Sequence, residues 1–163
     1  MKNLSMHILD ITQNSISAEA GLIQIKVNEQ PGRDLYEIVI EDNGKGMDAD
    51  LLGKVTDPYT TSRTTRNVGL GLALFKQNAE QAGGYLDVIS EPGKGTRVKA
   101  VFKHHHIDRP ALGDIVGTIS ILVSSNPKLD FIYIHRKNDQ EYVFDTREVK
   151  QVLEDAPIDE PQI

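Results

Sequence analysis

The chain has 163 residues, no cysteine and a formal net charge of −6. This length allows a single domain with a hydrophobic core, alone or with a small extension. The absence of cysteine excludes disulfides, thiolate metal sites and a cysteine nucleophile, and the negative charge argues against nucleic acid or an anionic membrane as the main partner.

The first 18 residues predict a helix. Apolar residues recur at helical spacing from Leu4 to Ile11, which is typical of a buried stripe. Asp10 and Asn14 are four residues apart, so both side chains are expected to project from one face beside that stripe.

Two strands are predicted next. Apolar and polar residues alternate over residues 23–27 and again over residues 36–40, which is the pattern of half-buried strands. A proline-glycine turn separates them, and the second strand runs directly into Asp42.

The middle of the chain predicts a loop, a helix and two more strands. Residues 48–68 show weak periodicity and contain a polar, basic loop at 60–66, and residues 70–82 are expected to form a helix that a pair of glycines ends. Strands at 86–88 and 98–102 flank a tight turn. These elements predict an α+β fold, a two-layer α/β sandwich in which helices cover one face of an antiparallel sheet.

The last 60 residues differ in character from the rest. Residues 1–103 carry 12 basic and 13 acidic residues, whereas residues 104–163 carry 6 and 11, so we expect a first domain and a small acidic C-terminal module. In the module the pattern predicts a linker at 104–110, helices near 115–122 and 148–154, and a hairpin of residues 131–135 and 141–144. The hairpin packs on the first domain or forms an edge for dimerisation, and the sequence leaves both open.

Asp42 is a candidate ligand for adenine. The base offers an exocyclic amino donor, so a carboxylate in a fixed position selects it, and Gly44 and Gly46 would let the backbone pass close to a flat ring. The alternative is that Asp42 only begins a good turn.

A second glycine segment, Gly69-Leu70-Gly71, stands directly before the predicted helix. A helix N-terminus offers unpaired N–H groups and partial positive charge, which suit phosphates. The Lys-Ser/Thr pair of a Walker-type loop is missing, and alone such a segment more often marks the turn at the start of a helix.

Asn14 and Asp10 supply oxygen atoms from one helix face. Mg²⁺ prefers oxygen ligands and few protein contacts, so the Asn14 amide oxygen with phosphates and waters would hold it. Asp10 would hold or polarise a water beside the γ-phosphate. The alternative is a pair of polar residues on a solvated helix face.

Five segments together resemble, in order, the N, G1, F, G2 and G3 boxes of the GHKL ATPases, the superfamily of histidine kinases, gyrase B, Hsp90 and MutL. The resemblance covers residues 1–103, and its last part looks most like the catalytic domains of sensor histidine kinases. The segments are 9–18, 40–47, 57–63, 68–74 and 91–102.

The resemblance implies the Bergerat fold and a domain that binds ATP with Mg²⁺. It implies Asn14 as the Mg²⁺ ligand, Asp42 and Thr96 as the residues that hold adenine, and Asp10 as the catalytic position.

The resemblance also implies a mobile lid over about residues 47–68, from which Arg63 and Arg66 would reach the phosphates. The further nucleotide-binding positions that it implies are Gly44, Gly46, Met47, Thr60, Arg63, Gly69, Leu70, Gly71 and Leu72.

Three departures from the family pattern bear on the reaction. Asp10 stands where hydrolysing members usually have Glu, which puts water activation in doubt, and Ser17 stands where histidine kinases often have a basic residue. No helical hairpin with a phosphoacceptor histidine precedes the domain, so autophosphorylation on a built-in histidine is not expected. His7 lies on the scaffold of the site, and the three histidines at 104–106 are expected to form a solvated linker rather than a metal site.

We therefore expect a cytoplasmic, histidine-kinase-like ATP-binding protein that acts in trans on a protein partner, as a kinase or an ATP-dependent regulator. One alternative is a slow ATPase that switches a partner, as in the gyrase and MutL branch, and another is a nucleotide-binding module without chemistry. No apolar run approaches the roughly 20 residues of a membrane span, and the N-terminus lacks a signal-peptide pattern.

Overall fold

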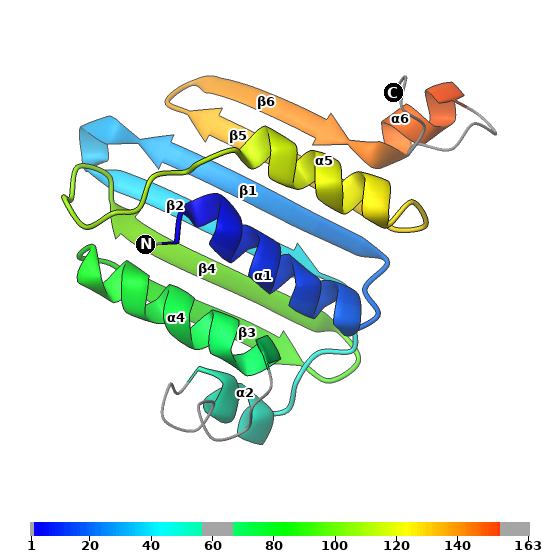
Figure 1. Cartoon of the computed structure of the whole chain (residues 1–163), viewed down its shortest axis with the longest axis horizontal. Coiled ribbons are helices and arrows are strands. Elements are labelled where there is room, and N and C mark those ends of the chain that lie inside the picture. Colours follow the sequence, from blue (N-terminus) through cyan, green and yellow to red (C-terminus); the bar gives the residue numbers. More distant parts are fainter. Residues whose placement is uncertain (1, 57–66, 154–163) are drawn as a thin grey trace.

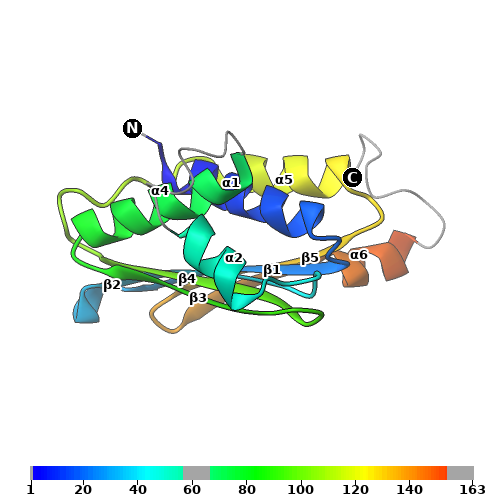
Figure 2. The ribbon, with the colours of Figure 1, turned by 90° about the horizontal axis from the view of Figure 1, so that it is seen from below.

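The computed structural model describes residues 2–56 and 67–153, which form a six-stranded sheet with helices layered on one face (Figures 1 and 2). The elements are, in chain order, α1 (Leu4–Ser17), β1 (Leu22–Gln30), the short 3₁₀ helix η1 (Pro31–Arg33), β2 (Leu35–Asp42), α2 (Ala49–Val55), α4 (Asn67–Gln81), β3 (Tyr85–Glu91), β4 (Gly95–Lys103), α5 (Ile115–Ser125), β5 (Asp130–Lys137), β6 (Gln140–Asp145) and α6 (Thr146–Leu153).

The strands lie in the order β3-β4-β2-β1-β5-β6. The first four strands of the chain pair antiparallel, which confirms the predicted sheet. The fifth does not follow this pattern, because β5 pairs with β1 in parallel. The sheet as a whole is therefore mixed, and the α+β two-layer architecture is confirmed.

The core lies between the helix layer and one face of the sheet. Leu4 and Ile8 of α1 are fully buried and Ile11 is 2% exposed, which confirms the predicted stripe. They join one cluster with alternate strand residues such as Ile25 and Ile40. The residues between these strand positions face the other side of the sheet, which the helices leave open (Figure 2).

Two helices differ from the prediction. Helix α2 lies in the stretch whose weak periodicity predicted no helix, and its N-cap Asp48 accepts a hydrogen bond from the Leu51 N–H at 2.8 Å. Only Val55 of this short helix is buried, so it shows no apolar period. Helix α4 begins at Asn67, so the glycine segment lies inside the helix rather than before it. Gly71 faces α1, where its lack of a side chain lets the two helices pack.

The C-terminal hairpin is confirmed, since β5 and β6 pair antiparallel. It packs on the first domain by extending the sheet through β1, and β6 becomes the outer edge (Figure 1). The buried Thr146 hydroxyl accepts the Phe131 N–H at 2.8 Å and ties α6 back to β5. The division into two modules at residue 103 remains a prediction, because a shared sheet does not assign a role to either part.

The helices of the described ranges, 2–56 and 67–153, are all too short or too polar to cross a membrane.

A polar cluster joins β1, β5 and the segment after β4, at the end of β1 away from Asp42. The two carboxylate oxygens of Glu29 meet His104 Nε2 at 3.1 Å and His135 Nε2 at 2.6 Å. Both Glu29 and His104 have side chains that are 14% exposed, so the expectation of a solvated linker is wrong for His104. An ionised carboxylate only accepts hydrogen bonds, so each imidazole donates its Nε2–H here.

Replacing Glu29 with Gln is expected to lower the free energy of unfolding by about 1–3 kcal/mol near pH 7, because one buried imidazole N–H loses its acceptor. Burial raises the pKa of Glu29, but the hydrogen bonds from His135 and His104 outweigh it and hold the pKa below its ordinary value. The stabilisation is therefore present above the ordinary carboxyl pKa and is lost as the pH falls through the folded-state pKa.

Urea denaturation of the wild type and of Glu29→Gln, at pH 7 and at pH 3, measures this contribution. Glu141→Gln on exposed β6 removes the same charge without the cluster and is the control. Equal unfolding free energies for Glu29→Gln and Glu141→Gln at pH 7 would show that the cluster contributes nothing.

Candidate functional site

Asp42 ends β2 on the face that the helices cover. Ile38 and Ile40, which precede Asp42 at every second position of β2, are 0% and 1% exposed. Alternate residues of a strand share one face of the sheet, so the Asp42 side chain points toward α1. Its Oδ2 accepts a hydrogen bond from the Ser15 hydroxyl at 2.6 Å, and its Oδ1 accepts the Gly44 N–H at 2.9 Å. The carboxylate is thus held from two elements that are far apart in the chain.

The turn after Asp42 is also structural, so the turn interpretation of this segment is correct in part. Asn43 Oδ1 accepts the N–H groups of Gly21 and Leu22 at 2.8 and 2.9 Å, which fixes the start of β1 against the end of β2. The structural turn and the half-buried acid are therefore compatible.

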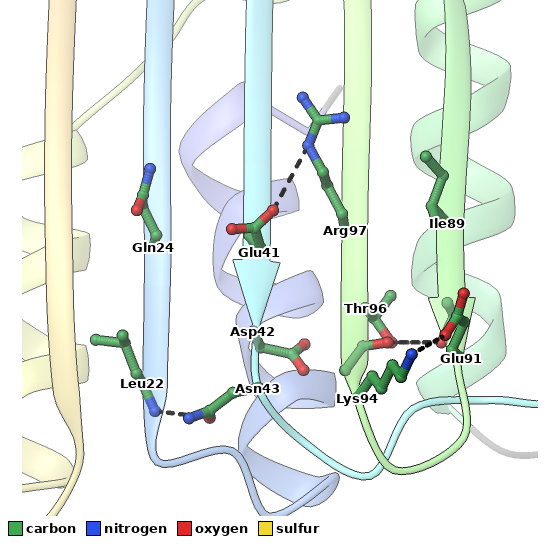
Figure 3. Close-up of a pocket in the computed structure, with 12 residues that line it drawn as sticks. Leu22, Gln24, Glu41, Asp42, Asn43, Ile89, Glu91, Lys94, Thr96 and Arg97 are labelled. Carbon is green, nitrogen blue, oxygen red and sulfur yellow. Dashed lines mark hydrogen bonds and ion pairs between the residues drawn. The ribbon is translucent and has the colours of Figure 1, made fainter.

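Thr96 lies directly opposite Asp42, because the two residues are register partners in the β2–β4 pair (Figure 3). The Thr96 hydroxyl is 2.8 Å from the Ser90 hydroxyl, which also accepts the Met47 N–H at 2.8 Å and donates to the Gly95 carbonyl at 3.1 Å. The structure thus brings together Asp42, Thr96 and Met47, three of the predicted site residues.

The glycines after Asp42 are required by protein packing. Gly46 has a φ of +71°, and a Cβ on it would lie 1.9 Å from the Glu91 carbonyl oxygen. A Cβ on Gly44 would lie 2.7 Å from the carbonyl oxygen of Ala18. Main chain therefore fills the space beside each glycine that was expected to leave room for a base. A direct role of Gly44 or Gly46 in binding a nucleotide remains a prediction.

Asp10 and Asn14 lie one turn apart on α1, both half-buried. Asp10 forms an ion pair with Lys2. A Cβ on Gly71 of α4 would lie 3.6 Å from the Asp10 Cβ, so the second glycine segment packs beside the predicted catalytic position. The two predicted phosphate-side elements are therefore neighbours in space.

Gly69, Leu70 and Gly71 belong to the first turns of α4 rather than to a turn before it. Only the first N–H groups of a helix have no partner within it, so of these three residues only Gly69 keeps a main-chain N–H that the helix leaves unpaired. Leu72 is 4% exposed and packs in the core, so its side chain does not face a ligand. Thr60, Arg63 and Arg66 lie outside the described residues.

A hollow of about 490 Å³ lies at the end of the sheet that carries Asp42 and Thr96, and both residues are among those that line it (Figure 3). From there it extends onto the open face of the sheet. Gln24, Glu41, Arg97 and Ile89 stand around it, with the helices behind the strands in this view. Glu41 and Arg97 form a 3.7 Å ion pair with both side chains about half exposed, and such surface pairs contribute little. The predicted phosphate-side residues lie on the opposite face.

Two site residues were missed from the sequence, Ser15 and Ser90. Each has a position that a pattern could have found: Ser15 follows Asn14 on the sheet-facing side of α1, and Ser90 continues the helix-facing phase of Leu86 and Val88 on β3. In the described parts of the chain, no group of three or more His, Asp or Glu residues is placed to hold a metal ion by itself.

The profile of the family described as histidine kinase-, DNA gyrase B-, and HSP90-like ATPase matches residues 2–106. The sensor kinase CckA of Brucella abortus is 35% identical over 89 residues, which are 54% of this chain and 9% of that protein. The sensor histidine kinase ZraS of Klebsiella oxytoca is 35% identical over 94 residues, which are 56% of this chain and 20% of that protein.

This chain therefore spans a fifth or less of the length of these relatives. Among solved structures, the Aquifex aeolicus MutL ATPase domain complexed with ADP has a TM-score of 0.56 and 14% sequence identity, with 94% of this chain and 69% of that chain covered. At this identity the likeness shows the fold alone.

Proposed function

This chain belongs to the family of histidine kinase-, DNA gyrase B- and HSP90-like ATPases, and we propose that it binds ATP with Mg²⁺ and acts in trans on a protein partner, as a kinase or an ATP-dependent regulator. The observation that carries the proposal is the pairing of Asp42 with Thr96 beside the helix that contains Asn14. An acceptor-only carboxylate in a fixed position suits the exocyclic amino group of adenine, and the ADP complex of the MutL domain has the same fold.

Asn14 and Asp10 would hold Mg²⁺ and its water. The donor set fits the ion, because Mg²⁺ takes oxygen ligands and keeps several waters, and both side chains are half-buried rather than sealed in the core. When bound, Mg²⁺ would neutralise charge on the phosphates. Asp10 would orient a water or a substrate hydroxyl only after its ion pair with Lys2 opens.

The start of α4 would hold the phosphates. Its first N–H groups, from Asn67 to Gly69, carry the partial positive charge of a helix N-terminus. Gly71 lies beside Asp10, which brings this end of the helix next to the proposed Mg²⁺ ligands. Thr60 and Arg63 would complete the phosphate side.

Three of the described histidines, His7, His104 and His135, are poorly placed to accept a phosphate, which favours an acceptor on another molecule. His7 is 1% exposed, is bonded to Asn78 and is stacked on Phe75, so its nitrogens cannot reach a phosphate in line. His104 and His135 bind Glu29, six residues along β1 from the residue that pairs with Asp42. At about 3.3 Å per residue this is roughly 20 Å from the adenine side.

A slow ATPase that switches a partner is the second candidate, supported by the likeness in fold to a MutL ATPase domain. One observation favours transfer over hydrolysis: the Asp10 side chain is one methylene shorter than that of Glu, so it is poorly placed to activate a water.

The fate of the γ-phosphate tests the proposed function. The purified chain is incubated with Mg²⁺ and γ-labelled ATP, with and without lysate of its own host. Transfer of label to a discrete protein is expected if the chain is a kinase, and label that stays on bound ATP is expected if it is a regulator. Release only as free phosphate would contradict both and support the ATPase switch.

Asn14→Ala is expected to abolish the Mg²⁺-dependent part of ATP binding, because it removes the proposed metal ligand. Gln13→Ala, an exposed neighbour on the same helix, is the matched control and is expected to behave as the wild type. Equal Mg²⁺ dependence in the two variants would remove Asn14 from the site.

A further inference from the structure

Ser15 connects α1 to the acid that would read the base. It is 4% exposed, and its hydroxyl donates to Asp42 Oδ2 at 2.6 Å. Hydrogen bonds from O–H to an ionised carboxylate are short and roughly twice as strong as neutral ones. The contact therefore fixes the Asp42 side chain more firmly than an ordinary surface hydrogen bond would.

The two oxygens of Asp42 receive one donor each, from different directions. The Gly44 N–H reaches Oδ1 at 2.9 Å from within the turn, and Ser15 reaches Oδ2 from the neighbouring helix. A carboxylate has about four lone-pair sites, so acceptor capacity remains for a ligand. With both donors in place, rotation of the carboxylate would break one of the two bonds.

We propose that Ser15 is a positioning residue that sets the specificity of the site for adenine, by holding Asp42 in the rotamer that accepts the 6-amino group. This inference rests on the proposed function. Ser15 does not contact the base; it acts through Asp42. Without its hydroxyl, Asp42 keeps only the bond from Gly44, and the free carboxylate must be ordered when the nucleotide binds.

The prediction is a loss that depends on the 6-amino group. Ser15→Ala is expected to weaken ATP binding about tenfold, and to have little effect on purine riboside triphosphate, which has hydrogen in place of that amino group. Ser15→Thr keeps a hydroxyl and is expected to restore the preference for ATP. Ser17→Ala, exposed at the end of the same helix, is the matched control.

Calorimetric titrations of the whole chain with both nucleotides and Mg²⁺, for the wild type and these three variants, test the inference. It is supported if, among the three variants, only Ser15→Ala loses the preference for ATP over purine riboside triphosphate, while thermal unfolding shows that this variant remains folded. It is overturned if Ser15→Ala keeps the wild-type ratio of the two affinities, whether both affinities fall equally or neither changes. In either case the proposed function stands. If the wild type itself does not prefer ATP, the adenine assignment fails and the role of Ser15 fails with it.

Discussion

Replacing Asp42 with Asn is expected to weaken ATP binding by about 30-fold or more. The change removes a charged acceptor for the base, a contact worth about 2 kcal/mol or more. It also places an amide N–H₂ next to Ser15 or the Gly44 N–H, where the structure has an acceptor for both. Isothermal titration with ATP and Mg²⁺ measures the effect.

Glu41→Gln is the matched control for this variant. Glu41 precedes Asp42 on β2 and lines the hollow on the open face, where it pairs with Arg97. Both variants remove one negative charge at the same end of the sheet, so any general charge effect on ATP is shared. A larger loss of ATP affinity for Glu41→Gln than for Asp42→Asn would place the nucleotide on the open face of the sheet and contradict the proposed site.

Lowering the pH from above 6.5 to below 4 is expected to remove about 3 kcal/mol of stability through His7 alone. Its pKa is lowered to about 4, chiefly because the ring is buried, with a further contribution from the nearby charge of Lys2, which Asp10 partly opposes. Between these pH values the unfolded chain binds more protons at His7 than the folded protein does. Stability therefore falls as the pH falls, and the contribution is fully present only above the unfolded pKa.

His7 holds α1 against α4, so this acid sensitivity lies in the layer that carries the proposed site. Its Nε2 is 2.6 Å from the Asn78 amide nitrogen and its ring stacks on Phe75 with centroids 4.9 Å apart. The amide nitrogen of Asn78 can only donate, so Nε2 accepts and the ring is neutral. A proton added to Nε2 would replace that hydrogen bond with two facing donors.

Denaturant unfolding of the wild type and of His7→Gln at several pH values isolates this term. Glutamine offers an acceptor near the Nε2 position and does not titrate, so the difference in unfolding free energy between the two proteins should change with pH between 6.5 and 4. The exposed His105 provides the control variant His105→Gln. A difference that stays constant over this range would show that His7 is not the acid-sensitive group.

The parts of the fold that are local in sequence were predictable. The buried stripe of α1, the first four strands and the position of Asp42 at a strand end all follow from apolar period and turn residues, whereas Thr96 came only from the family resemblance. In this α+β fold, period and strand ends determine which face and which edge a side chain occupies.

The contacts that depend on distant parts of the chain were not predictable. Nothing local shows that β5 runs parallel to β1, or that His135 meets Glu29 across a separation of 106 residues. The positions of Ser15 and Ser90 could have been found from their patterns, but their contacts could not, because their partners come from other elements. Glycine was also ambiguous, since Gly46 meets main chain at a turn whereas Gly71 allows two helices to pack.

A structure of this chain with Mg²⁺ and a non-hydrolysable ATP analogue would test the central claim most directly. The account predicts adenine on the helix-covered side of the sheet, with its amino group within hydrogen-bond distance of Asp42 and with Mg²⁺ on Asn14. Adenine in the hollow of the open face, between Gln24 and Arg97, would contradict it.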